Sequence, residues 1–321
     1  MKNQLKISIG AYSDKGRKEI NQDFQDIRVP SEPQLTSKGI AIAIADGISS
    51  SPVSQIAAKV SVTSFLEDYF STPESWSVKK SAERVLQATN SWLNSQTAQS
   101  QYHYDKNRGY VCTLSAMVIR SSTAHIFHIG DTRIYRLRDN VLEQLSEDHQ
   151  LWVSQDKSYL SRAMGMESEL RADYLTFPVQ KDDYYFFMSD GVYEFITAEL
   201  ILENLDAYGE DFDKVAQNIA KIAYDEGSED NLSIQFVRID ALASGGLNEI
   251  YKELSEKPMP PILEARDRFD GYSVIRELSG SSRSHVYLVV DEETKELLVI
   301  KTPSIDMRED KAYLERFMME E

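Results

Sequence analysis

The feature that most limits how this chain can fold is an unbroken apolar run that ends on a carboxylate. Residues 40–45 read IAIAIA and are followed directly by Asp46 and a glycine. A continuous apolar run of this length is typical of a strand that is buried on both faces. The pattern recurs where residues 184–189, YYFFMS, meet Asp190 and a second glycine. Two buried strands that each carry an Asp-Gly pair at the tip predict one shared site.

The bulk composition is that of an ordinary globular protein and disfavours several classes. Lys and Arg number 35 against 52 Asp and Glu, and the net charge of −17 disfavours nucleic acid as a partner. The single cysteine, Cys112, excludes an intrachain disulfide and fits a reducing compartment. No run reaches the ~18 apolar residues of a membrane helix, and the N-terminus has no signal-peptide core. We expect a soluble, cytoplasmic protein, and a membrane anchor beyond residue 321 is left open.

The pattern of the first 241 residues predicts an α+β domain, residues 1–241, with antiparallel sheets. Strand-like runs are joined by tight turns, and helical segments are interspersed among them instead of alternating regularly with strands. Helical spacing predicts three helices, at 52–70, 78–96 and 212–226, and places Ser51 as the N-cap of the first.

The amino-acid composition of the chain changes after residue 241. Residues 242–268 contain three prolines within four residues and predict a linker. Residues 269–321 predict three strands, with a turn at 291–295, and the beginning of a helix. A unit of about 50 residues makes a marginal core, so we interpret it as a fragment of a longer domain.

Five aspartates stand at strand ends or tight turns beside apolar segments: Asp23, Asp46, Asp131, Asp190 and Asp230. A carboxylate near a low-dielectric core is costly unless it is paired or binds a metal. Oxygen ligands with few histidines favour Mg²⁺ or Mn²⁺ over Zn²⁺. Any one of the five could be a turn or helix-cap residue, but that reading does not explain two Asp-Gly pairs behind buried strands. The spacing predicts a divalent-metal site and specifies no reaction.

A family resemblance is carried by seven segments: SDKGRKEINQD, IADGISS, CTLSAMV, HIGDTRIYRL, SRAMG, MSDGVYEF and EDNLSI. In this order, across residues 13–234, they resemble the motifs of the metal-dependent Ser/Thr protein phosphatases (PPM, type 2C), specifically the bacterial branch. The resemblance implies a four-layer sandwich of two antiparallel β-sheets flanked by helices, with a metal site at one rim. It also implies hydrolysis of phosphoserine and phosphothreonine in proteins, with two Mn²⁺ or Mg²⁺ ions as cofactors.

The same resemblance implies a role for each acidic residue. The first Asp-Gly pair would bridge two metal ions through Asp46 and bind one of them through the glycine carbonyl. Asp190 and Asp230 would bind the other ion, and Asp23 would act through metal-bound water. Asp131, together with Asp190, would hold a weaker third ion. A hydroxide that bridges the two metals would attack phosphorus in line, which makes Asp46, Asp190 and Asp230 the catalytic set. The implied metal ligands are Asp23, Asp46, Gly47, Asp131, Asp190 and Asp230.

Two departures from the family pattern concern the substrate. The basic residue expected five positions before Asp23 is Lys18, and Arg17 stands one position further back. Either Arg17 is shifted into place, or Lys18 binds the substrate phosphate as a point charge; we favour Arg17, with a solvated basic pair as the alternative. Ile48 occupies the position of a proposed general-acid histidine in eukaryotic members, so the leaving group would take its proton from water. A second function therefore stays open, that of a phosphatase-like module that binds a partner without turnover.

Other chemistry-bearing residues in these motifs are interpreted as structural. Cys112 lies in a strand pattern and is predicted to belong to the core, where it would not serve as a nucleophile. Arg133 is predicted to form an ion pair, and His149 is predicted to anchor a loop.

The C-terminal segment is similar to the start of a Ser/Thr protein kinase domain. Lys301, in LVIK, matches the ATP-binding lysine, although Ser279, Ser281 and Ser284 occupy the glycine positions of the phosphate loop. This partial N-lobe lacks the catalytic loop and the metal-binding aspartate, so we expect no kinase activity from it. The resemblance implies a phosphatase–kinase fusion that acts on phosphorylated proteins, among them its own or a neighbouring kinase domain. An accessory β-rich extension is the alternative.

Overall fold

Two units make up the chain, Met1–Ser244 and Gly245–Glu321, and each is described by itself. No described helix is long and apolar enough to cross a membrane. The computed structural model describes residues 4–74, 76–154, 157–242, 260–292, 294–307, 313 and 317.

Two five-stranded antiparallel sheets form the centre of the first unit. In sheet order, the first consists of β1 (Lys6–Asp14), β12 (Leu232–Ala241), β11 (Tyr184–Met188), β6 (Arg133–Arg138) and β7 (Val141–Gln144). In the same way, the second consists of β10 (Asp173–Pro178), β5 (Thr123–Ile129), β4 (Leu114–Arg120), β3 (Ile40–Ala45) and β2 (Phe24–Arg28). A separate two-stranded sheet consists of β8 (Gln150–Ser154) and β9 (Lys157–Leu160).

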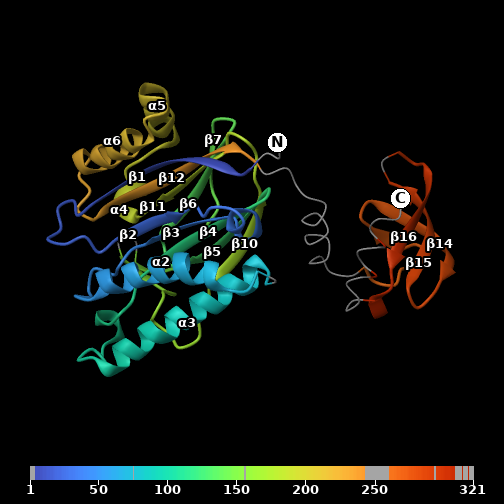
Figure 1. The fold of residues 1–321 in the computed structure, drawn as a ribbon, viewed down its shortest axis with the longest axis horizontal. Helices are drawn as coiled ribbons and strands as arrows, with labels where there is room; N and C mark the ends of the chain where they lie inside the picture. The colour runs from blue at the N-terminus through green and yellow to red at the C-terminus, as the bar shows by residue number, and fades with distance from the viewer. Residues whose placement is uncertain are drawn as a thin grey trace. The chain divides into compact units, whose positions relative to one another are not determined.

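Helices cover the outer faces of the two sheets. Helices α2 (Ser54–Ser71) and α3 (Val78–Gln99) lie on one side, and α5 (Ala198–Tyr208) and α6 (Phe212–Asp225) lie on the other (Figure 1). The short elements are α1 (Gln34–Lys38), α4 (Asp190–Tyr193) and the 3-10 turn η1 (Lys106–Arg108). Helix, sheet, sheet and helix form four layers, so the predicted α+β sandwich of antiparallel sheets flanked by helices is confirmed.

The packing of strand β3 explains why its sequence alternates between alanine and isoleucine. Its three alanines belong to the core beneath α2 and α3, whereas its three isoleucines belong to the core between the two sheets. All six side chains are fully buried. Alanine lets a helix approach the sheet closely, and isoleucine fills the gap of ~10 Å between two packed sheets. The prediction of a strand buried on both faces is confirmed.

The sequence prediction of the helices needs correction at two points: the start of one helix was misplaced, and another helix was missed. Helix α2 begins at Ser54 and no side chain caps it; the hydroxyl of Ser51 accepts a hydrogen bond from the N–H of Val53 at 3.1 Å, ahead of the helix, and donates to the carbonyl of Gly109 at 2.7 Å. Helix α5 was absent from the predictions. Its ends carry the usual signals, since the side chain of Thr197 caps the first turn and Gly209 follows the last residue.

The second unit is built on a four-stranded antiparallel sheet. The three predicted strands and the turn between the last two are confirmed. Leu263, within the predicted linker, is buried in the core of this unit. Residues 243–259 of that linker and most of the predicted terminal helix lie outside the described residues. The elements are β13 (Arg268–Phe269), β14 (Tyr272–Gly280), β15 (Ser284–Asp291), β16 (Leu297–Pro303) and the 3-10 turn η2 (Ile305–Met307).

Exchanging the two faces of β3 tests this packing. The double variant Ile42→Ala/Ala43→Ile keeps the composition of the strand, and we expect it to lose about 3 kcal/mol or more of unfolding free energy. The reason is that it opens a cavity between the sheets and overpacks the helical side. Urea unfolding followed by tryptophan fluorescence measures the loss, because all 3 tryptophans lie in the first unit. Ile42→Val is the control, with an expected loss of about 1 kcal/mol; equal stability of the two variants would contradict the two-faced packing.

Candidate metal centre

Acidic residues from both sheets meet at one cavity of about 610 Å³, which we call the acidic cavity. Asp46 follows β3 and Asp190 follows β11, while Asp131 lies in the turn between β5 and β6 and Asp230 precedes β12. These four aspartates line the cavity together with Gly47 and Ile48. The structure therefore brings the tips of both buried strands to the same place.

The first Asp-Gly pair is held by the segment that precedes β4. The N–H of Asp46 donates to Thr113 Oγ1 at 2.9 Å, and the N–H of Thr113 donates to the Asp46 carbonyl at 2.7 Å. The N–H of Gly47 donates to the carbonyl of Gln22 at 3.2 Å. A β-carbon on Gly47 would lie 2.7 Å from that of Ser54. Glycine is therefore needed where this loop passes the first turn of α2.

The second Asp-Gly pair is held against the segment that precedes β12. Asp190 Oδ1 accepts a hydrogen bond from the N–H of Gly191 at 2.7 Å, and Asp230 Oδ1 accepts one from the N–H of Asn231 at 2.8 Å. A β-carbon on Gly191 would collide with the carbonyl oxygen of Asn231. This close backbone approach keeps Asp190 and Asp230 beside each other.

The two remaining aspartates differ in position. Asp131 lines the cavity, and its Oδ2 accepts a hydrogen bond from Gln150 Nε2 at 2.8 Å. Asp23 is only 7% exposed and lies behind the lining, where Ser189 Oγ donates to its Oδ2 at 2.9 Å. Its Oδ1 is buried and has no hydrogen-bond partner in the described part of the chain. A buried carboxylate oxygen without a donor is costly, which suits an atom that faces a cation or water.

Burial and mutual repulsion raise the pKa of these acidic groups. Burial raises the pKa of Asp190 to about 8, and the charges of Asp230, Asp131 and Asp23 add to that rise. Burial also raises the pKa of Asp23 to about 6. The pKa of Asp46 lies well above its usual range, first through burial and then through its acidic neighbours. Because each group feels the charge of the others, a divalent cation among them would relieve the repulsion.

The donor set fits a hard divalent cation in its chemistry. The cavity lining offers carboxylate, carbonyl and hydroxyl oxygens and contains neither histidine nor cysteine. Within the described residues, no three His, Cys, Asp or Glu side chains are already arranged to hold a metal ion. The carboxylates thus line the cavity without converging on one position. Repulsion between like charges favours such an arrangement.

The two basic residues predicted to contact the substrate point to different neighbours. Lys18 Nζ lies 3.1 Å from Asp230 Oδ2, at the rim of the acidic cavity. The guanidinium of Arg17 lies over the ring of Tyr224, 3.9 Å from its centroid, and donates to the carbonyl of Ser228. Lys18, and not the favoured Arg17, therefore contacts a residue of the cavity.

Residues that hold the loops of the site were missed by the sequence predictions. Gln22 is buried, and its side chain donates to the carbonyl of Ser51 at 2.9 Å. The N–H of Gln22 donates to Asn231 Oδ1 at 2.8 Å, and Asn231 Nδ2 donates to the carbonyls of Lys15 and Ile20. Gln22 and Asn231 each adjoin a predicted aspartate in a motif segment, and this adjacency was the available signal.

The predicted structural roles in the same motifs are confirmed. Arg133 forms an ion pair with Asp148 at 2.7 Å. His149 Nε2 lies 3.0 Å from Asp173 Oδ2, which ties its loop to β10. Cys112 is fully buried, and burial raises the pKa of its thiol to about 12. A thiol held neutral in the core is not a nucleophile.

Comparison with known proteins gives a family match. A family profile described as "Protein phosphatase 2C" matches residues 12–234. The serine/threonine phosphatase stp of Listeria monocytogenes serotype 4b is 28% identical over 220 residues, which cover 64% of this chain and 86% of that protein. The protein phosphatase PhpP of Streptococcus pneumoniae serotype 2 is 23% identical over 254 residues, which cover 73% of this chain and 98% of that protein.

Solved structures share the fold of the first unit. The serine/threonine phosphatase of S. agalactiae superposes with a TM-score of 0.63 at 21% identity, covering 73% of this chain and 100% of its own. The Mycobacterium tuberculosis phosphatase PstP superposes with a TM-score of 0.61 at 20% identity, covering 74% of this chain and 99% of its own. At this identity the likeness concerns the fold.

Replacing one of the repelling carboxylates tests the electrostatics of the cavity. In EDTA at neutral pH, we expect Asp190→Asn to melt about 2–8 °C above the wild type. The raised pKa of Asp190 means that its stability cost grows as the pH rises above 3.8, the ordinary value, and asparagine removes that cost. Scanning fluorimetry should also show a smaller rise with Mn²⁺ for the variant than for the wild type. Asp206→Asn, on the exposed side of α5, is the control. If Mn²⁺ raised the melting temperature of Asp190→Asn as much as that of the wild type, Asp190 would not be a metal ligand.

Proposed function

The chain belongs to the protein phosphatase 2C family, and we propose that it hydrolyses phosphoserine and phosphothreonine in proteins at the acidic cavity. The observation that carries the proposal is the meeting of two Asp-Gly strand tips with two further aspartates around one cavity, all within the matched residues. Its curated relatives include serine/threonine phosphatases, which supports the same substrate class for this chain.

We assign the cofactor as Mn²⁺ or Mg²⁺, the ions that the family uses. A solved relative, the catalytic domain of PstP, is in complex with 2 manganese ions. When bound, such ions lower the pKa of water and offset the charge on phosphoryl oxygens. The buried Asp23 Oδ1, which has no hydrogen-bond partner among the described residues, and a lining with four carboxylates and without histidine or cysteine support this assignment. The proposed ligands are Asp23, Asp46, Asp131, Asp190, Asp230 and the carbonyl of Gly47.

The residues of the chain bind and orient the substrate. Asp46 and Asp190 are mounted on strands whose side chains are packed on both faces, so their carboxylates keep their positions at the cavity. Lys18 is the cation at the rim, and we now assign to it the contact with the substrate phosphate that was expected of Arg17. Ile48 lines the cavity and has no proton to donate, so the departing alcohol takes its proton from water.

The second unit is not part of the family match, which ends at residue 234. Its three longer strands and the position of Lys301 on β16, across from Val286 of β15, are compatible with the start of a kinase N-lobe. The kinase fusion, and a kinase domain as substrate, stay predictions. We assign no activity to this unit.

Turnover tests the proposal directly. We expect the full chain to hydrolyse p-nitrophenyl phosphate and phosphothreonine peptides with Mn²⁺ and not in EDTA. Asp46→Asn should lower kcat/KM by about 100-fold or more, because it removes a carboxylate that would hold the ions. Turnover that needs no metal would refute the mechanism. Phosphopeptide binding with Mn²⁺ bound and no turnover would favour the alternative of a binding module.

The choice between the two basic residues is tested by a matched pair of variants. We expect Lys18→Gln to raise KM for p-nitrophenyl phosphate about 10-fold, because a charge-assisted contact to the phosphate is lost. Arg17→Gln should leave KM within about 2-fold, since its guanidinium is engaged by Tyr224 and Ser228. Lys18→Arg should restore binding. The reverse ranking of the two glutamine variants would return the role to Arg17.

A further inference from the structure

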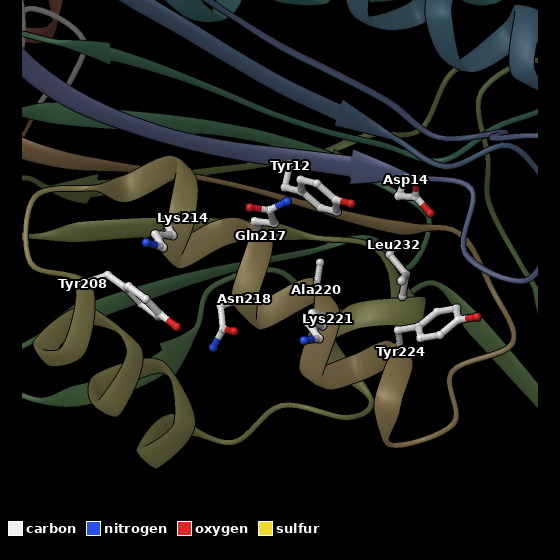
Figure 2. Close-up of a pocket in the computed structure, with 10 residues that line it drawn as sticks. All are labelled: Tyr12, Asp14, Tyr208, Lys214, Gln217, Asn218, Ala220, Lys221, Tyr224 and Leu232. Atoms are coloured by element: carbon white, nitrogen blue, oxygen red, sulfur yellow. The ribbon is translucent and has the colours of Figure 1, made fainter.

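A second cavity lies along helix α6, and we call it the α6 groove. It has a volume of about 480 Å³. Figure 2 shows its 10 lining side chains, which come from α6, from the end of β1, from the end of α5 and from the start of β12. They include three tyrosines, two lysines and two side-chain amides, and none of them lines the acidic cavity. The groove is therefore a separate site, rich in aromatic and basic groups.

The lysines of the groove are available to a ligand. Lys214 and Lys221 are exposed and lie seven residues apart on α6, about 10.5 Å along the helix axis. Neither makes an ion pair with an acidic side chain in the part of the chain that is described. Lys214 Nζ lies 5.4 Å from the ring centroid of Tyr208. In a chain of net charge −17, two such lysines on one groove form a local positive site.

Two carboxylates close to the groove accept hydrogen bonds from the backbone. Asp14, which lines the groove, accepts a hydrogen bond from the N–H of Gly16 at 2.8 Å. Asp213, the neighbour of Lys214, accepts one from the N–H of Ala11 at 3.2 Å. Both carboxylates are thus directed to the backbone of β1 and the turn after it, and neither forms an ion pair with Lys214 or Lys221.

One end of the groove adjoins the rim of the acidic cavity. Tyr224 lines that end, and the guanidinium of Arg17 lies over its ring. The next residue in the chain, Lys18, contacts Asp230 of the acidic cavity. A row of four cations therefore follows one path, from Lys214 and Lys221 through Arg17 to the rim.

The shape of the groove favours an extended chain as its occupant. Its lining spans about ten residues of α6, or about 15 Å, and several of the lining side chains are exposed. A site for a small molecule usually encloses most of the ligand surface, which an open groove does not do. A peptide in the extended polyproline II conformation repeats every three residues, so two carboxylates three residues apart lie on one face, about 9 Å from each other, close to the spacing of the lysines.

We propose that the α6 groove binds an acidic segment of the phosphorylated protein substrate and that the row of cations guides its phosphorylated residue to the acidic cavity. This inference rests on the proposed phosphatase function. Tyrosine rings and side-chain amides provide contacts for the peptide backbone and for apolar side chains, while the two lysines select for acidic ones.

Kinetics with paired peptides tests the groove. Two phosphothreonine peptides are compared, one with a Glu-x-x-Glu segment and one with Gln-x-x-Gln, each placed at increasing distances on either side of the phosphothreonine. We expect the full chain with Mn²⁺ to show a KM about 3- to 10-fold lower for the best acidic peptide, a preference that shrinks with added salt. Lys214→Gln/Lys221→Gln should abolish the preference and leave hydrolysis of p-nitrophenyl phosphate unchanged. Lys79→Gln/Lys80→Gln, on the opposite outer face, is the matched control and should retain it.

Direct binding separates the failure of this inference from the failure of the proposed function. If the chain hydrolyses nothing, fluorescence anisotropy of a labelled acidic peptide without phosphate still reports on the groove. Binding that is lost in Lys214→Gln/Lys221→Gln, and not in the control, would support the groove alone. Equal KM values for the two peptides at every spacing would overturn the inference. So would saturable ATP binding that displaces the acidic peptide, because the groove would then be a nucleotide site.

Discussion

Repulsion among carboxylates at the edge of a dry core is the constraint on which the rest of the first unit depends. Burial and neighbouring charges raise the pKa of Asp190 to about 8 and that of Asp46 well above its usual range. Left free, such groups would turn towards water. They stay because β3 and β11 are packed on both faces, so that their tips cannot shift without disturbing the apolar cores on either side. The packing of the sandwich thus stabilises an arrangement that its own charges oppose.

Hydrogen bonds between loops of different sheets complete the arrangement. Asp23 leads into β2 of one sheet, and Asp230 leads into β12 of the other. The N–H of Gln22 donates to the side chain of Asn231, whose amide in turn donates to the carbonyl of Ile20, and these contacts join the two tips. Glycine at position 47 allows the neighbouring loop to pass close to α2. Rigid strands determine the direction of each carboxylate, and these loop contacts determine the distance between them.

Much of the fold and of the candidate metal site could be predicted from local sequence patterns. The unbroken apolar run of β3 predicted a strand buried on both faces, because burial follows from the character of adjacent residues. The oxygen-rich character of the site could be predicted for the same reason. Helix α5 has recognisable end signals in Thr197 and Gly209, and it was missed although it is equally local. The Gln22–Asn231 contact joins residues 209 positions apart, and no local pattern encodes a hydrogen bond of that kind.

By itself, the sequence determined that two apolar strands end on Asp46 and Asp190, that the ligands offered are oxygens, and that motifs of one family run from residue 13 to 234. Only the tertiary structure decided which basic side chain reaches the cavity. Tyr224 of α6 and the Ser228 carbonyl engage Arg17, and the adjacent Lys18 lies against Asp230. The α6 groove was likewise invisible in the sequence, since β1 and α6 come together only in the folded chain. Strand burial depends on neighbouring residues, whereas the direction of a long charged side chain depends on partners that folding brings from more than 200 residues away.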